Sequence, residues 1–152
     1  MTTDLHVLLA EDDDGHATLV RRNFKRAGLA SELVVLRDGQ ELLDYVQRRG
    51  GWAERPALDA VAMIVDLNMP RLGGYDVLRY LKSDADLSRI PVFVLTTTDN
   101  PAELERCYQL GAAACLVKPV DYGEFGEMAQ RFARFLMTAR LPPERTPDGD
   151  AR

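Results

Sequence analysis

Polar side chains that could do chemistry follow the apolar runs of this chain at the points where those runs end. Asp66 ends the run AVAMIV, which is rich in β-branched and aliphatic residues and leads into turn formers. The ends of other runs carry Glu11, Asp12, Thr96 and Lys118. Such runs are typical of strands buried on both faces, and open parallel α/β sheets bind ligands beyond the carboxyl ends of their strands. These residues are therefore candidates for one shared site. Taken alone, Asp66 could equally cap the turn that follows it.

Three of the candidates are carboxylates that would crowd one edge of the sheet. Glu11, Asp12 and Asp66 do not all stay ionised unaided at close range, because like charges raise one another's pKa. A hard divalent cation relieves this conflict, and Mg²⁺ takes oxygen ligands while keeping several waters. The backbone carbonyl of Asn68 is a candidate further ligand. The alternative is that the acidic segment 11–14 is a solvated loop that caps the next helix.

Thr96 and Lys118 would complement such a metal site. Thr96 offers a hydroxyl, and Lys118 offers a compact positive charge on a long stem. A phosphoryl group carries a charge of roughly −2 and needs groups of this kind beside it. Each residue is ordinary by itself, since threonine suits strands and lysine suits surfaces. Together with the carboxylates they predict a phosphoryl site.

The composition describes a globular protein of one domain. The chain has 152 residues, of which 46% are hydrophobic and 28% charged, with a net charge of −5. An acidic chain without a basic face argues against nucleic-acid binding. No apolar run approaches the roughly 20 residues of a membrane span, and the first residues lack the pattern of a secretory signal, so a cytoplasmic location is expected. Cys107 and Cys115 are expected to be free, buried thiols.

Strand and helix patterns alternate five times along the chain. Strands are predicted at 6–10, 32–36, 60–66, 90–95 and 113–117, and helices at 16–27, 38–49, 74–84, 100–111 and 121–140. This alternation predicts an α/β fold, a doubly wound five-stranded parallel sheet of order 2-1-3-4-5, covered on both faces. Residues 1–140 should form one domain. Residues 141–152, LPPERTPDGDAR, have little apolar area to bury and are expected to form a disordered tail.

Four sequence blocks resemble the signatures of two-component response-regulator receiver domains. They are AEDD, IVDLNMPRLGGYDVL, PVFVLTTTD and LVKPVD, in the family's order, and the match covers about residues 5–138. The resemblance implies the flavodoxin-like receiver fold and transfer of a phosphoryl group from a histidine kinase. The roles it implies are phospho-acceptor for Asp66, Mg²⁺ ligands for Glu11, Asp12, Asp66 and the Asn68 carbonyl, phosphoryl contacts for Thr97 and Lys118, and switch hydroxyl for Thr96.

One position departs from the family pattern. Cys115 stands where the family often has the aromatic residue that moves with the switch threonine. Signalling is then expected to use the loop after Thr96 or an interface. The chain further resembles stand-alone regulators paired with bacterial phytochrome kinases, in its long loop with Trp52 and its LTTTD and KPVD blocks. That resemblance implies a phytochrome kinase as partner.

The last predicted helix suggests a homodimer. Its apolar residues exceed what one side of a sheet needs, and a second copy could cover the surplus; they are Phe125, Met128, Phe132, Phe135 and Leu136. The predicted contact face consists of the fourth helix, the fifth strand and the fifth helix. The alternative is that all five side chains enter the chain's own core. His16 is near the acidic segment and could approach the metal, but it is expected to be an ordinary surface residue in a first helical turn.

The sequence favours a signalling switch that is not an enzyme over two other classes of protein. A phosphohydrolase of the dehalogenase type also forms an aspartyl-phosphate, but it needs a second acid where this chain has Asn68. A nucleotide-binding module needs a glycine-rich turn after the first strand, and here that turn is acidic. Turnover of a small phosphate ester would favour the phosphohydrolase, and stoichiometric labelling would favour the switch.

Overall fold

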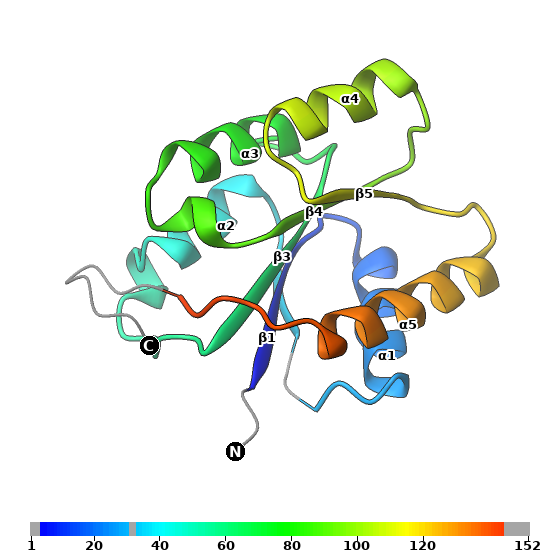
Figure 1. The fold of residues 1–152 in the computed structure, drawn as a ribbon, viewed down its shortest axis with the longest axis horizontal. Coiled ribbons are helices and arrows are strands. Elements are labelled where there is room, and N and C mark those ends of the chain that lie inside the picture. Colours follow the sequence, from blue (N-terminus) through cyan, green and yellow to red (C-terminus); the bar gives the residue numbers. More distant parts are fainter. Residues whose placement is uncertain (1–3, 31–32, 145–152) are drawn as a thin grey trace.

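The computed structural model describes residues 4–30 and 33–144 and forms one parallel sheet with helices on both faces. The strand order β2-β1-β3-β4-β5 confirms the predicted 2-1-3-4-5 topology (Figure 1). The strands are β1 (Leu5–Ala10), β2 (Leu33–Leu36), β3 (Ala60–Asp66), β4 (Val92–Thr96) and β5 (Ala114–Val117). The helices are α1 (Asp14–Arg26), α2 (Gly39–Val46), α3 (Gly74–Ser83), α4 (Pro101–Gln109) and α5 (Tyr122–Thr138), with short 3-10 turns η1 (Gly50–Trp52) and η2 (Leu87–Arg89).

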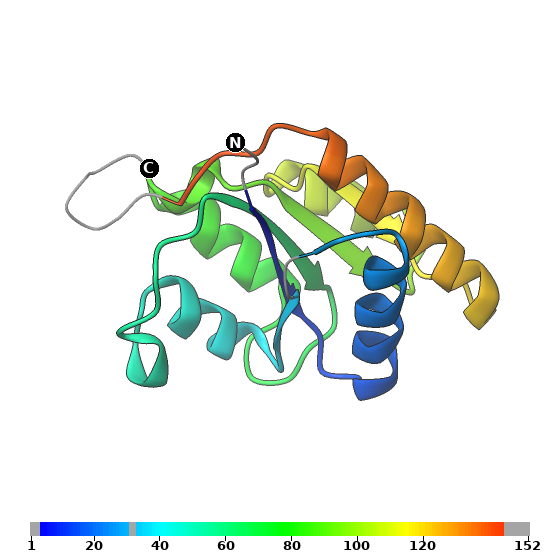
Figure 2. The same ribbon diagram turned by 90° about the horizontal axis from the view of Figure 1, so that it is seen from below.

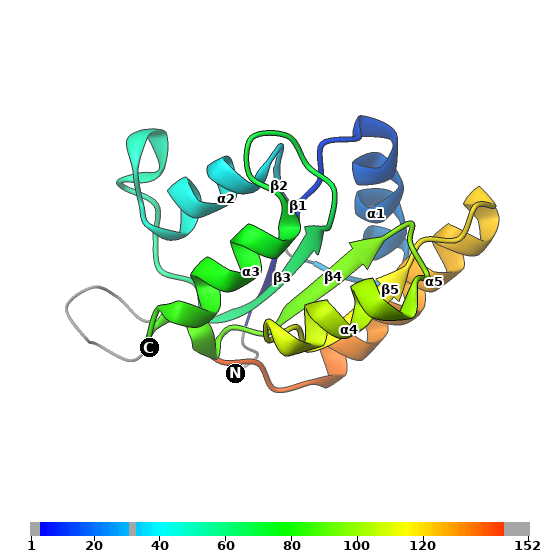
Figure 3. The same cartoon turned by 90° about the horizontal axis from the view of Figure 1, so that it is seen from above.

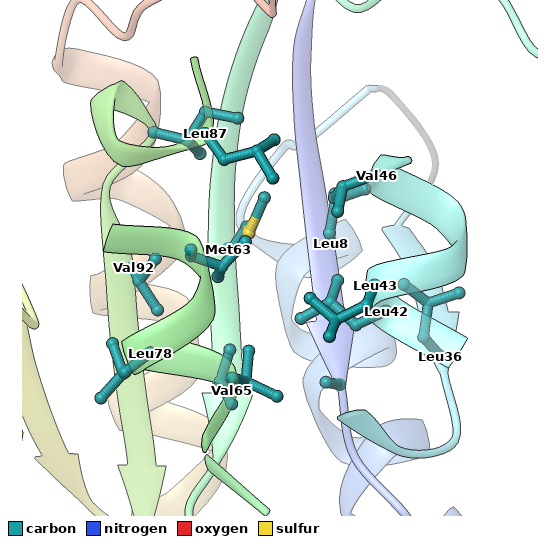
Figure 4. Packing of buried hydrophobic residues seen from close by; sticks show 14 of the residues in the cluster. Leu8, Leu36, Leu42, Leu43, Val46, Met63, Val65, Leu78, Leu87 and Val92 are labelled. Carbon is teal, nitrogen blue, oxygen red and sulfur yellow. The ribbon is translucent and has the colours of Figure 1, made fainter. Parts of the chain in front are cut away.

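Alternating side chains of the strands build one core on each face of the sheet. In β1, Leu8 points to the face covered by α2, α3 and α4, whereas Leu9 points to the face covered by α1 and α5. Met63 and Ile64 divide in the same way in β3, which is buried along its whole length. Figure 4 shows the first of these cores, with side chains of β1, β3 and β4 packed against α2 and α3. Burial on both faces explains why the strands read as continuous apolar runs.

Capping side chains set the starts of four helices. Asp13, Asp38, Asn100 and Asp121 each accept a hydrogen bond from a backbone N–H in the first turn. Such caps satisfy donors that the helix itself leaves unpaired. The end of α2 differs from the prediction, because the helix stops at Val46 rather than near residue 49. Arg48 has a φ of 58°, a left-handed conformation that an α-helix does not continue through.

The segment after α5 packs against the opposite end of the sheet from Asp66. The backbone N–H of Val61 donates to the carbonyl of Pro142 at 3.1 Å, and that of Glu144 donates to Leu58 at 3.0 Å. Figure 2 shows this orange-to-red segment leaving α5 and crossing near the start of β1. The predicted tail 141–152 therefore includes four residues, up to Glu144, that the structure describes as packed, and the rest of it lies outside the described residues. The predicted division at residue 140 stays a prediction. Every helix in the described part of the chain is too short or too polar to span a membrane.

Candidate functional site

The strand register brings the predicted site residues to one edge of the sheet. Asp66 is the last residue of β3 and pairs with Leu95, beside Thr96 at the end of β4. Glu11 directly follows β1, and Lys118 directly follows β5. Figure 3 shows the arrowheads of β3 and β4 pointing to this shared edge, next to the start of α1. Groups separated by more than 100 positions in the sequence, such as Glu11 and Lys118, therefore meet there.

Lys118 is the centre of the hydrogen-bond network at this edge. Its Nζ donates to Asp66 Oδ2 at 2.5 Å and to Glu11 Oε1 at 2.7 Å, and only 4% of the lysine side chain is exposed. Burial alone would lower the pKa of Lys118, but its hydrogen bonds with Asp66 and Glu11 outweigh burial and raise that pKa. The lysine is therefore charged and aimed at Asp66.

The three predicted carboxylates form a group that could hold a metal ion. One oxygen from each of Glu11, Asp12 and Asp66 lies within 4.8 Å of the others. Burial, together with the neighbouring Asp66, raises the pKa of Glu11 to about 8, despite the opposing effect of Lys118. Among the described residues, Glu11 Oε2 has no hydrogen-bond partner although it is buried. A buried acceptor without a donor, beside two more carboxylates, fits a bound divalent cation.

The loop after β3 holds Asp66 in place. The backbone N–H of Asn68 donates to Asp66 Oδ1 at 2.8 Å, so both oxygens of the carboxylate are oriented, one by this amide and the other by Lys118. Gly74 begins α3 close to this loop, and a Cβ there would lie 2.8 Å from the carbonyl oxygen of Asp66. The absence of a side chain at Gly74 therefore allows α3 to start directly against the acceptor loop.

The threonines after β4 lie at the same edge but are engaged in their own loop. Thr96 is fully buried, and its Oγ1 accepts a hydrogen bond from the backbone N–H of Thr98 at 3.1 Å. Thr98 in turn donates its hydroxyl to Glu103 of α4 at 2.7 Å. Thr97 is exposed beside them. This chain of contacts connects the site edge to the start of α4.

Cys115 of β5, which stands where the family often has an aromatic residue, lies at the contact between β5 and α4. The thiols of Cys107 and Cys115 interact, and the backbone N–H of Cys115 donates to the hydroxyl of Tyr108 at 3.1 Å. Cys107 is buried, as predicted, whereas Cys115 is only partly buried. Burial raises the pKa of both thiols, that of Cys107 to about 11. Cys115 therefore connects β5, which ends at the site, to helix α4.

Most of the apolar residues of α5 enter the chain's own core. Phe125 and Leu136 are 1% exposed, and Met128 and Phe132 are packed against the same cluster. Phe135 is the exception, with 56% of its surface exposed. The structure therefore supports the intrachain alternative for four of the five residues. The other exposed large apolar side chains lie near both ends of α5, on α4 and β5, and on α3; they are Tyr80, Tyr108, Val117, Val120, Tyr122 and Met137.

His16 belongs to the site although its sequence position indicated an ordinary surface residue. Its Nδ1 lies 3.0 Å from Lys118 Nζ and 3.3 Å from Glu11 Oε1. The contact with Lys118 spans 102 positions. A histidine in the first turn of a helix gives no sequence signal of such a partner. Its place beside the acidic segment indicated only that it could approach the metal, not that it contacts Lys118.

Comparisons with known proteins agree with this architecture. The family model of the response regulator receiver domain matches residues 7–130. Response regulator Rcp1 of Synechocystis sp. is 34% identical over 137 residues, which cover 90% of this chain and 92% of Rcp1. The probable methanogenesis regulatory protein FilR2 of Methanothrix harundinacea is 32% identical over 130 residues, covering 85% and 81% of the two chains.

Solved structures of similar proteins have the same fold. The phosphorylated cyanobacterial phytochrome response regulator RcpA superposes with a TM-score of 0.83 at 30% identity, covering 90% of this chain and 97% of RcpA. The Mn²⁺-bound form of Rcp1 superposes with a TM-score of 0.82 at 33% identity, covering 90% and 98%. These matches support the receiver prediction and not the dehalogenase-type phosphohydrolase.

Proposed function

The chain belongs to the response-regulator receiver family, and from this premise we propose that Asp66 is the residue that accepts a phosphoryl group. The observation that carries this proposal is the placement of the Asp66 carboxylate between a charged lysine and a carboxylate cluster at the ends of the strands. A carboxylate oxygen of Asp66 attacks the phosphorus atom of the donor as the bond to the leaving group breaks. Lys118 neutralises charge on the transferred group.

Glu11, Asp12 and Asp66 would hold the metal ion that the transfer needs, with the Asn68 carbonyl as a further ligand. When bound, the ion neutralises charge on the phosphoryl oxygens and orients them. An all-oxygen, partly open ligand set of this kind suits Mg²⁺. The existence of a Mn²⁺-bound form of the similar protein Rcp1 supports the binding of a divalent metal by this chain. Glu11 must lose its proton to serve as a ligand, since burial in the metal-free protein favours its neutral form.

The phosphoryl group on Asp66 is contacted by three residues, which are Thr96, Thr97 and Lys118. The backbone N–H of Thr97 and the ammonium group of Lys118 donate to the phosphoryl oxygens, and the Thr96 hydroxyl turns toward them. In the described structure this hydroxyl accepts from the Thr98 N–H, and Thr98 binds Glu103. Withdrawal of Thr96 from its loop would therefore release a contact that leads to α4. With Cys115 at the aromatic position, this loop is the route for the signal.

The phosphoryl donor is a sensor histidine kinase in the cytoplasm. The similarity to RcpA, a phytochrome response regulator, supports a phytochrome kinase as the partner. FilR2, of comparable identity, is a probable regulator of methanogenesis, so the phytochrome pairing needs its own test. Phosphotransfer from a panel of purified histidine kinases, with a phytochrome kinase among them, provides that test. Preferential labelling by the phytochrome kinase would support the pairing, and equal or weaker labelling would contradict it.

The output surface is the face formed by α4, β5 and the start of α5, and its occupant is a second copy of the chain. Tyr108, Val117, Val120 and Tyr122 expose apolar area there, and Val120 is 98% exposed. Identical patches meet across a two-fold axis in the commonest type of homo-oligomer. A standard interface buries about 1,600 Å² in total, which a face of two helices and an edge strand can supply.

Labelling with acetyl phosphate and Mg²⁺ tests the proposed reaction. The parent protein should gain one phosphoryl group per chain by intact mass, and Asp66→Asn should gain none, because an amide is not an adequate nucleophile. Asp76→Asn is the matched control, since Asp76 is an exposed carboxylate on α3. Equal labelling of the parent and Asp66→Asn would disprove the assignment. Continuous hydrolysis of a phosphate ester without stoichiometric labelling would favour the phosphohydrolase.

A further inference from the structure

His16 fills the third acceptor position around the ammonium group of Lys118. An ammonium group has three N–H donors and no acceptor. In the structure its neighbours are Asp66 Oδ2 at 2.5 Å, Glu11 Oε1 at 2.7 Å and His16 Nδ1 at 3.0 Å. A proton on Nδ1 would place two donors face to face. Glu11 Oε1 is also near Nδ1, at 3.3 Å, but the ammonium group is closer, so the geometry favours a lone pair at Nδ1 and the proton on Nε2.

Two further contacts fix the imidazole ring of His16. The backbone N–H of His16 donates to Asp13 Oδ1 at 3.0 Å, which anchors the residue in the first turn of α1. The ring lies 5.5 Å, centre to centre, from the ring of Phe125, which is 1% exposed and belongs to α5. The His16 side chain is itself only 24% exposed. The acceptor at Nδ1 is thus held in place by two helices rather than by solvent.

The His16 contact is the one that phosphorylation leaves intact. A phosphoryl group on Asp66 replaces the carboxylate that Lys118 now binds, and a metal ion competes for the oxygens of Glu11. Neither event uses the Nδ1 atom of His16. A neutral imidazole also adds no negative charge beside Lys118, whereas a third carboxylate would cancel more of the positive charge of the lysine. The arrangement holds the lysine without weakening its attraction for a phosphoryl group.

We infer that His16 is a positioning residue for Lys118, whose Nδ1 atom keeps the ammonium group directed at the phosphoryl group on Asp66. This role rests on the proposed function, because it gives Lys118 a phosphoryl group to bind. It differs from a structural role of the ring against Phe125, because it depends on one acceptor atom. An asparagine supplies that atom, since its Oδ1 and the histidine Nδ1 are each two bonds from Cβ. A glutamine places its oxygen one bond further out.

Three substitutions test this role through the rate of labelling by acetyl phosphate. His16→Ala and His16→Gln should label about tenfold more slowly than the parent, as expected for loss of one hydrogen bond to a charged group. His16→Asn should stay within about threefold of the parent, and the Mg²⁺ affinity of all three should change less than threefold. A parent-like rate in His16→Ala, or a rate in His16→Asn as low as in His16→Ala, would overturn the inference.

Nitrogen NMR of the parent protein provides a readout that needs neither phosphorylation nor a variant at this position. The chain has two histidines, so His6→Gln assigns the signals of His16. The His16 spectrum should show the Nε2–H form with an unprotonated Nδ1, and beryllofluoride with Mg²⁺ should shift the Nδ1 signal as Lys118 redirects its other donors. A proton on Nδ1 would contradict the inference. If the parent protein fails to label at all, the proposed function is wrong, and the Nδ1 measurement still decides whether His16 binds Lys118.

Discussion

Glu11 is the residue at which protons and metal ions compete. Its carboxyl is buried, and its pKa of about 8 lies far above the ordinary value because burial and Asp66 disfavour the charged form. A metal ion binds the charged form and must displace the proton. Mg²⁺ affinity should therefore rise by up to roughly tenfold per pH unit between about pH 5 and pH 8 and level off above that.

Calorimetric titration with Mg²⁺ at several pH values checks this prediction, because it measures both the affinity and the protons released. Glu11→Gln should bind the ion more weakly and show a flatter dependence over the same range. An affinity that does not change between pH 5 and pH 8 in the parent would show that Glu11 is already ionised or does not bind the metal.

At the scale of residues, sequence pattern predicted the groups at strand ends but not their partners. The acid pair, Asp66 and Lys118 were predictable because each follows an apolar run, and parallel strands place such positions at one edge. His16 was not, because its role depends on a lysine 102 positions away that folding alone brings near. The raised pKa of Glu11 was likewise unpredictable in size, since it depends on how deeply the end of β1 is buried.

At the scale of elements, the segment after α5 is fastened by a buried ion-pair cluster. Glu144 is 5% exposed and accepts hydrogen bonds from Arg55 Nη1 at 2.8 Å, from Arg55 Nη2 and from Arg48 Nη2 at 3.3 Å. Arg55 also lies over the ring of Tyr45, 4.3 Å from its centre, and Tyr45 packs edge-on against Trp52. The long loop and the segment after α5 therefore hold each other against the start of β3.

Glu144→Ala should lower the free energy of unfolding by about 3 kcal/mol, because it leaves the buried guanidinium group of Arg55 without its partner. Denaturant titration of the variant and the parent measures the difference. Glu127→Ala, at an exposed position of α5, is the matched control and should change stability by less than about 0.5 kcal/mol. If both variants unfold alike, the cluster contributes nothing to holding the segment. Labelling of Asp66 should persist in Glu144→Ala, since the cluster lies at the other end of the sheet.

The sequence predicted the helices and strands but not the packing of the segment after α5. Apolar runs and caps predicted all five strands and five helices, because burial and unpaired helix donors act locally. The end of α2 was missed because it depends on the left-handed conformation of Arg48. The packing of Leu141 to Glu144 was missed because a proline-rich, polar stretch gives no sequence signal of two arginine partners 89 and 96 positions earlier.

At the scale of the whole molecule, we still predict self-association through the α4–β5–α5 face, but the structure changes which residues make the contact. The core residues of α5 are unavailable, so the contact should depend on exposed Val120 and Tyr122. Val120→Asp should weaken the dimer at least tenfold, because a charge would be buried in an apolar contact. Sedimentation equilibrium with and without beryllofluoride measures this. Tyr80→Asp, on the exposed side of α3, should leave the dimer intact.

A parent protein that stays monomeric at high micromolar concentration, with and without beryllofluoride, would show that this face serves another partner. A dimer that survives Val120→Asp but not Tyr80→Asp would place the interface on α3. Either result would leave the chemistry at Asp66 untouched, because the acceptor and its lysine are buried within one chain.

The central claim, that Asp66 is the phosphoryl acceptor, is tested most directly by locating the modified residue. Sodium borohydride reduces an aspartyl phosphate to homoserine, and peptide mapping by mass spectrometry then identifies the position. After incubation with acetyl phosphate and Mg²⁺, we expect homoserine at position 66 and at no other carboxylate. Homoserine at Asp12 or elsewhere, or none at all in a protein that has gained a phosphoryl group, would contradict it.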